Sequence, residues 1–150
     1  MVAGPRGHLF YDGPVGNHAF TNYEVKAIIK TYPGANSGLY VATSFLENNW
    51  PSQGYEIQVN NSHTDWRRTA SLYGIIDTAE KLVHDEEWFE LYVKVEGKHI
   101  TTKINGRTVV EYDEPAGKTD ARRIQPGTIA IQAHDPKSRI VYKSVQVKLN

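Results

Sequence analysis

The sequence of 150 residues contains no cysteine, which excludes both a disulfide framework and a thiolate metal site. It also has no excess of either charge, because 17 Lys and Arg residues balance 17 Asp and Glu residues. A generic binder of nucleic acid or of an anionic membrane needs a basic excess, so neither partner is expected. No apolar run approaches the roughly 18–20 residues of a membrane span. The first seven residues lack the apolar region of a signal peptide.

Alternation of apolar and polar residues is the main local pattern. Residues 23–30 and 89–96 are apolar at every second position and mostly charged between. This period of two is typical of a strand with one face in a core and the other in water. Asn105-Gly106 lies between two such runs, and Asn-Gly accepts positive φ at both central positions of a two-residue hairpin turn. Strands are therefore expected at 23–30, 89–96, 99–104, 107–112, 128–134 and 140–149.

The expected strands cover most of the chain, and no segment has a convincing helical period. The implied class is all-β and antiparallel, a sandwich or jelly roll. In the last strand, the alternation places Val141, Val145, Val147 and Leu149 on one face. Three loops, 45–53, 61–70 and 113–126, are long for hairpin connections, and long ordered loops of a sandwich are where function tends to lie.

A row of polar side chains follows one expected strand, residues 54–60. Glu56, Gln58 and Asn60 share a face, at intervals of about 6–7 Å. Gln132 and His134 form a second row, and the two rows converge on one concave surface if their strands belong to the same sheet. The alternative is an ordinary solvated face, although amides and His are less typical of one than Lys, Glu and Thr.

The catalytic options of this row are restricted. A retaining glycosidase needs two carboxylates about 5–5.5 Å apart, whereas the row holds one acid and two amides. Six histidines show no helical metal-site spacing, so a mixed His and carboxylate site from several strands is the remaining metal hypothesis. Trp50 and Trp66 lie in polar loops on either side of the Glu56 strand, where a ring either stacks on a sugar or pins its own loop.

Six segments together carry a resemblance to a known family: 36–40, 54–60, 71–74, 87–89, 103–106 and 127–135. Their order and spacing resemble the 3-keto-disaccharide hydrolase domain family from about residue 7 to residue 149. The resemblance implies a concanavalin A-like jelly-roll β-sandwich, a bacterial and exported (periplasmic or secreted) protein, and a carbohydrate substrate. Family members act on glycosides already oxidised to a ketone at C3.

The resemblance also implies a chemistry that needs only one carboxylate. A C3 ketone acidifies the C2 proton, so a single base can remove it, the C1 group leaves by elimination, and water then adds. Glu56 and His134 are carried over as base or divalent-metal ligand, and Tyr73 as proton donor. The side chains expected to contact the sugar are Gln58, Asn60, Gln132, Trp50, Trp66, Arg67 and His63.

Two positions depart from the family pattern: Ala42 stands where members often have His or Arg, and Ala70 where they commonly have Gly. Members also begin with a portion before the segment matching residues 6–9. We therefore expect a single domain, 1–150, that either is trimmed at its front or completes its sheet with a partner chain or in an oligomer.

Three functions stay open at this level. The first is a 3-keto-glycoside hydrolase or lyase, which Glu56 and His134 favour. The second is a non-catalytic carbohydrate-binding module on the same face, which Ala42, Trp50 and Trp66 favour. The third is an interaction domain completed by another chain.

Overall fold

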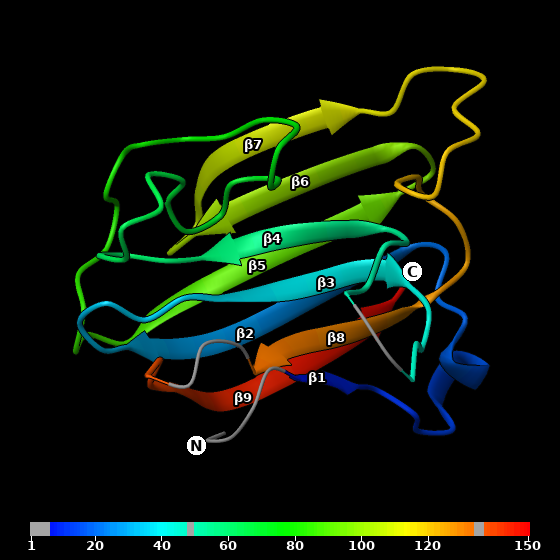
Figure 1. Ribbon diagram of the computed structural model, residues 1–150. Helices are drawn as coiled ribbons and strands as arrows, with labels where there is room; N and C mark the ends of the chain where they lie inside the picture. The colour runs from blue at the N-terminus through cyan, green and yellow to red at the C-terminus, as the bar shows by residue number, and fades with distance from the viewer. Residues whose placement is uncertain (1–6, 48–49, 134–136) are drawn as a thin grey trace.

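The computed structural model describes residues 7–47, 50–133 and 137–150, which form two antiparallel sheets packed face to face (Figure 1). One sheet has the strand order β1-β8-β3-β4 and the other β7-β6-β5-β2-β9. The strands are β1 (Gly7–Phe10), β2 (Tyr23–Thr31), β3 (Ser37–Thr43), β4 (Tyr55–Val59), β5 (Phe89–Glu96), β6 (His99–Ile104), β7 (Arg107–Asp113), β8 (Thr128–Ala133) and β9 (Ile140–Leu149). A 3-10 helix, η1 (Val15–His18), precedes β2. This architecture confirms the expected all-β sandwich. In the part of the chain that the structure describes, no helix is long and apolar enough to span a bilayer.

The core lies between the sheets and is built from the alternating strands. In β2 and β5 every second side chain, beginning with Tyr23 and Phe89, is buried, as the period of two predicts. Leu39, Val41 and Ile57 of the facing sheet are fully buried against them. Each fully buried aliphatic side chain of this kind contributes about 1.5–3 kcal/mol of hydrophobic free energy.

The predicted hairpin turn is confirmed between β6 and β7. Asn105 and Gly106 have φ values of 48° and 83°, both in the left-handed region that a two-residue turn of this type requires. The Asn105 side chain also accepts a 2.8 Å hydrogen bond from the Glu90 N–H, which joins the turn to the start of β5.

The expected face of β9 is wrong at one end. The pairing of β9 with β2 shifts register between Ile28 and Ile29, and this irregularity reverses the alternation along β9. As a result Ile140 and Tyr142 pack against the core together with Val145 and Val147, whereas Val141 does not.

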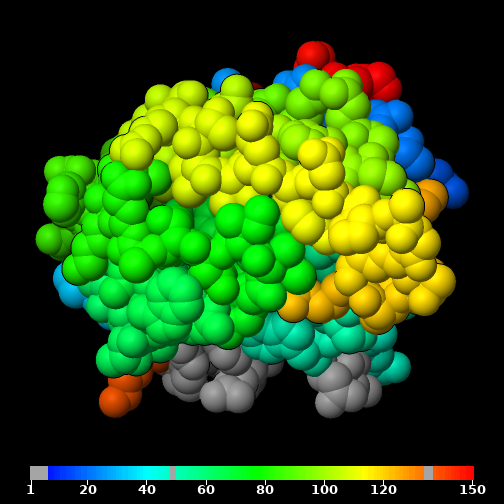
Figure 2. Space-filling model, turned by 90° about the horizontal axis from the view of Figure 1, so that it is seen from above, coloured from blue at the N-terminus to red at the C-terminus, as the bar shows by residue number. Residues whose placement is uncertain are grey.

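Strands β4 and β8 belong to the same sheet, so Glu56 and Gln58 of the first polar row share a face with Gln132 of the second, whereas His134 lies outside the described residues. Tyr40 of β3 pairs with Glu56 on one side and with Ala130 on the other, so Gln132, two residues on, shares their face. However, this face is not an open surface. Loops cover it, and only 6% of Glu56, 1% of Gln58 and 3% of Gln132 is exposed. Figure 2, a view from above, shows loop 61–88 (green) and loop 114–127 (yellow to orange) beside each other at the upper edge of the sandwich.

Candidate functional site

A cavity lined by Glu56 lies at the first residues of β4 and has a volume of 490 Å³. Strands β3 and β4 supply Tyr40 and Glu56, and the three surrounding loops supply the rest of the wall. The side chains that matter for its chemistry are Tyr40, Trp50, Glu56, Tyr73, Lys118 and Arg122. The wall therefore holds two phenols, two cations and two acids, because Asp120, the ion-pair partner of Lys118, also lines the cavity.

Tyr73 is held at the cavity because residues 69–73 run alongside β4 as an additional edge. The Ala70 N–H donates to the Gln58 carbonyl at 2.9 Å, and the Tyr73 N–H donates to the Glu56 carbonyl at the same distance. Ala70 adopts a φ of 73°, a left-handed conformation that favours glycine. The positive φ explains why glycine suits this position in the family. In this chain Ala70 adopts the same left-handed conformation.

Loop 114–127 closes the other side of the cavity and brings in the cations. The Gly54 N–H donates to the Ala121 carbonyl at 3.2 Å, which ties the loop to the start of β4. The Arg122 guanidinium donates to the Tyr73 carbonyl. Lys118 forms an ion pair with Asp120 at 2.6 Å. These contacts hold Arg122 in the cavity wall, from where its charge lowers the pKa of Glu56 in part.

The environment of Glu56 raises the pKa of its carboxyl group. Burial raises its pKa to about 7, and the field of Asp65 adds to this, while the Tyr40 hydroxyl and the Arg122 charge lower it in part. A carboxyl group with a pKa near 7 exists substantially as a carboxylate at neutral pH and accepts a proton more readily than an ordinary one. The Glu56 side chain fits only because residue 38 is glycine, since a Cβ at Gly38 would lie 2.5 Å from Oε1 of Glu56.

Tyr40 is the immediate neighbour of Glu56 across the β3–β4 pairing. It is 1% exposed, and burial together with the neighbouring Glu56 carboxylate raises the pKa of its hydroxyl. Tyr40 therefore stays protonated at neutral pH and remains a hydrogen-bond donor beside the base.

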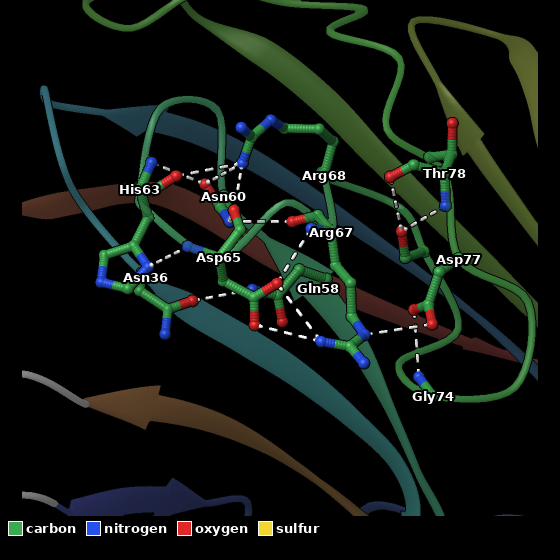
Figure 3. Close-up of polar contacts among 11 residues, drawn as sticks. Asn36, Gln58, Asn60, His63, Asp65, Arg67, Arg68, Gly74, Asp77 and Thr78 are labelled. Carbon is green, nitrogen blue, oxygen red and sulfur yellow. Dashed lines mark hydrogen bonds and ion pairs between the residues drawn. The ribbon is translucent and has the colours of Figure 1, made fainter.

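Asn60, at the other end of β4, is committed to a hydrogen-bond network rather than to the cavity (Figure 3). Its amide nitrogen donates to the carbonyls of Asp65 and Arg67 at 2.9 and 2.8 Å. Its amide oxygen accepts from the His63 N–H at 2.8 Å and from Arg68 at 3.2 Å. Asn60 is fully buried, so all four bonds hold the loop that follows the strand.

Gln58 and Gln132 are buried on the same face of the sheet as Glu56. The Gln58 side chain donates to Asn36 at 2.7 Å. The Gln132 Oε1 atom is buried and accepts no hydrogen bond among the described residues. Neither side chain belongs to the wall of the Glu56 cavity.

The remaining predicted sugar contacts of loop 61–70 lie outside the cavity wall. His63 accepts a 3.1 Å hydrogen bond from the Asp65 N–H. Arg67 forms ion pairs with Asp65 and Asp77 and lies 4.8 Å over the Tyr73 ring, so it reaches the cavity only through Tyr73. Trp66 is 52% exposed, with the Arg67 guanidinium 5.1 Å from its ring centroid.

His134, expected as a base or metal ligand, lies outside the described residues. Among the residues that are described, no group of three or more His, Asp or Glu side chains is arranged to hold a metal ion. Ala42 is fully buried, has a φ of 53° and donates its N–H to the Tyr23 hydroxyl at 2.8 Å. It lies at an irregularity of β3 pairing and is not part of the cavity wall.

Of the predicted residues, the structure brings together Glu56, Tyr73 and Trp50. Four charged or phenolic residues of the cavity wall were not predicted as site residues: Tyr40, Lys118, Asp120 and Arg122. Tyr40 had a usable signal, since it lies in the segment 36–40 that carries the resemblance. Arg122 and Lys118 lie in the long loop 113–126, which the loop length had indicated without singling out any residue.

Comparison with known proteins places the chain in a family. The chain has a TM-score of 0.77 and 20% identity to a candidate glycosyl hydrolase from Parabacteroides distasonis ATCC 8503, over 97% of this chain and 84% of that one. A second candidate glycosyl hydrolase from that organism has a TM-score of 0.71 and 20% identity, over 86% and 72%. The carbohydrate-binding module CBM66 from Bacillus subtilis has a TM-score of 0.68 and 10% identity, over 97% and 83%. At these identities the likeness establishes the jelly-roll sandwich fold alone, and no curated protein matches the chain. The family model of the 3-keto-alpha-glucoside-1,2-lyase-like domain matches residues 2–148, and the chain therefore belongs to this family, the 3-keto-disaccharide hydrolase domains.

Proposed function

We propose that this chain cleaves 3-keto-glycosides by elimination followed by hydration, a net hydrolysis, with Glu56 as the base. The observation that carries the proposal is the position of Glu56, a buried carboxyl group with a pKa of about 7 at the wall of a 490 Å³ cavity. Membership of the family and the fold shared with candidate glycosyl hydrolases support the same substrate class.

The first step assigned to Glu56 is removal of the C2 proton, which the C3 ketone makes acidic. The electron pair of the C2–H bond forms an enolate, whose negative charge rests on the C3 oxygen. Arg122, fixed in the wall, and the protonated Tyr40 hydroxyl beside Glu56 are suited to stabilise that charge.

In the second step the enolate collapses, a C1=C2 double bond forms, and the C1–O bond breaks with its electron pair leaving on the aglycone oxygen. Tyr73 lies in the same wall and is assigned the proton transfer to that oxygen. Water then adds across the resulting enone: its oxygen bonds to C1, Glu56 returns its proton to C2, and the proton that the water loses restores the Tyr73 hydroxyl, which completes the hydrolysis.

A divalent metal would act on the same oxygen of the enolate, by polarising the ketone. In this proposal Arg122 supplies the positive charge, so activity is expected to persist when chelator is present. Loss of all activity on treatment with chelator, and its return with Mg²⁺, Mn²⁺ or Zn²⁺, would transfer that role from Arg122 to a metal.

The direct test is incubation with methyl 3-keto-glucosides of both anomeric forms, in parallel with the unoxidised methyl glucosides. We expect release of methanol from a 3-keto substrate and none from its unoxidised counterpart, because only the ketone acidifies C2. Absence of turnover of either 3-keto anomer by folded protein, with and without divalent metal, would refute the proposal.

One observation favours a second candidate, a non-catalytic carbohydrate-binding role: the fold resembles that of CBM66 over 97% of this chain. The substitution Glu56→Gln separates the two functions. A binding module would keep its affinity for a 3-keto-glucoside and would show no turnover to lose, whereas an enzyme would lose its rate.

A further inference from the structure

Arg67 lies over the ring of Tyr73, the side chain assigned the proton transfer to the leaving group. The central carbon of its guanidinium is 4.8 Å from the centroid of that ring. Tyr73 belongs to the wall of the Glu56 cavity, whereas Arg67 is not among the described residues of that wall. Arg67 can therefore act on a substrate at Glu56 only through Tyr73.

Two carboxylates hold the guanidinium of Arg67 from either side (Figure 3). Its Nε donates to Oδ2 of Asp77 at 3.1 Å, and its Nη1 lies 3.4 Å from both carboxylate oxygens of Asp65. The three side chains are 14–28% exposed, Asp77 the least and Arg67 the most. An arginine held by two partly buried carboxylates keeps its orientation better than a single exposed ion pair does. The guanidinium therefore offers the Tyr73 ring a fixed surface.

Asp77 also reaches the backbone next to Tyr73. Its Oδ1 accepts a 3.0 Å hydrogen bond from the Gly74 N–H, so one carboxylate ties Arg67 to the turn that follows Tyr73. The Tyr73 N–H donates to the Glu56 carbonyl at 2.9 Å. These bonds fix the backbone of Tyr73, but its ring can still occupy different χ1 rotamers unless a neighbour packs against it. The guanidinium of Arg67 packs against one face of the ring.

The contribution of Arg67 is one of position rather than of charge. Arg67 carries one positive charge and its partners Asp65 and Asp77 carry two negative charges, so the cluster has no surplus positive charge to stabilise a phenolate at Tyr73. A planar guanidinium nevertheless stacks on an aromatic ring. Lysine has no such plane, so it is not expected to replace arginine here.

We propose that Arg67 is a positioning residue, which holds the Tyr73 ring in the rotamer that directs its hydroxyl at the leaving-group oxygen. The inference rests on the proposed function, in which the C1–O bond breaks with its electron pair on the aglycone oxygen and the Tyr73 proton moves to that oxygen. A ring that turns would place this proton correctly for only part of the time, and the step would slow. Sugar binding should be unaffected, because Arg67 lies outside the cavity wall.

The kinetic test compares methyl and 4-nitrophenyl 3-keto-glucosides with the Arg67→Met and Arg67→Lys variants. Methanol needs a proton to leave, whereas 4-nitrophenolate leaves without one. For the methyl substrate kcat should fall about tenfold in both variants with little change in KM, whereas for the 4-nitrophenyl substrate kcat should stay within about twofold of wild type. Arg107→Met is the matched control, since Arg107 of β7, in the other sheet, forms an ion pair with Glu80 and should leave both rates unchanged. An equal loss for the two substrates, or no loss for either, would overturn the proposal.

A double substitution separates positioning from a general effect on the fold. The Tyr73→Phe variant has no hydroxyl to direct, so adding Arg67→Met should lower kcat for the methyl substrate no further. A further loss of about tenfold in the double variant would contradict the proposal, because Arg67 would then act elsewhere.

A measurement on the ring itself keeps this inference separate from the proposed function. Three-bond NMR couplings from the backbone nitrogen and carbonyl carbon to Cγ of Tyr73 report its χ1 angle without any substrate. We expect the values of a single rotamer in the wild type and in Arg107→Met, and averaged values in Arg67→Met. That result without turnover of any 3-keto-glucoside would retain the positioning contact while the proposed reaction fails. Averaged values in the wild type, or a single rotamer in Arg67→Met, would refute the positioning role whether or not the protein is active.

Discussion

The two ends of β4 differ in what their polar side chains have to do. Asn60 makes four side-chain hydrogen bonds and is fully buried, whereas Glu56, four residues earlier on the same face, opens onto a cavity with its pKa raised to about 7. A satisfied amide stabilises the fold, while a buried carboxylate at a cavity destabilises the fold and gains reactivity. Polar residues in one row are therefore not equivalent. The hydrogen-bond partners of each side chain indicate whether it stabilises the fold or is available for chemistry.

The largest expected effect is on the rate of the Glu56→Gln variant. Glutamine has nearly the same shape but accepts no proton at neutral pH, so kcat/KM for a methyl 3-keto-glucoside should fall by about a thousandfold or more. Glu90→Gln is the matched control, because Glu90 forms an ion pair with Lys26 on the other sheet. A Glu56→Gln enzyme within tenfold of wild type would remove the distinction between the two ends of β4.

Substitution of Asn60, at the opposite end of the strand, should lower the stability of the fold. Asn60→Ala leaves the Arg67 carbonyl without its side-chain donor and the His63 N–H without its side-chain acceptor, whereas the Asp65 carbonyl keeps Arg68 as a donor. The free energy of unfolding should fall by about 3 kcal/mol. Asn22→Ala removes one exposed hydrogen bond to the Gly97 N–H and should cost less than about 1 kcal/mol. Urea unfolding measures both. An equally small effect of the two substitutions would contradict the structural role of Asn60.

Glu56→Gln should also change how stability depends on pH. The pKa of Glu56 rises from its ordinary 4.5 to about 7 on folding, so the folded chain binds more protons than the unfolded chain between these values. The free energy of unfolding of the wild type therefore falls as pH rises through this window, by up to about 3 kcal/mol. Glutamine does not titrate, so the variant should equal the wild type near pH 4.5 and exceed it by up to about 3 kcal/mol at pH 8. A difference between the two proteins that stays constant with pH would show that burial of this carboxylate has no such cost.

The strands other than β1 and β3, and the hairpin turn, could be predicted, because each follows from local periodicity or turn chemistry. β2 and β5 alternate over their whole length, and Asn105-Gly106 has few other stable conformations. The face of β9 could not be predicted, since its alternation is broken by the pairing with β2, a tertiary feature.

A place on a strand did not decide which site residues were predictable, because Tyr73 and Trp50 lie in loops and were predicted, whereas Tyr40 lies on β3 and was not. Glu56 follows from the alternation of β4, but Arg122 comes from a loop whose path is set by hydrogen bonds to Gly54 and Tyr73, for which the sequence has no period. Asn60 was expected to bind sugar because its place in the row is the same as that of Glu56. Only the loop folding back over it reveals the four bonds that occupy its side chain.

The central claim is that Glu56 acts as a base whose pKa has been raised by burial. The pH dependence of kcat/KM for a methyl 3-keto-glucoside tests it most directly, because this profile reports the ionisation of the free enzyme's base. We predict that kcat/KM rises with pH, reaches half of its plateau near pH 7 and then levels off. A half-plateau near pH 4.5, or a rate independent of pH from 5 to 9, would contradict the claim.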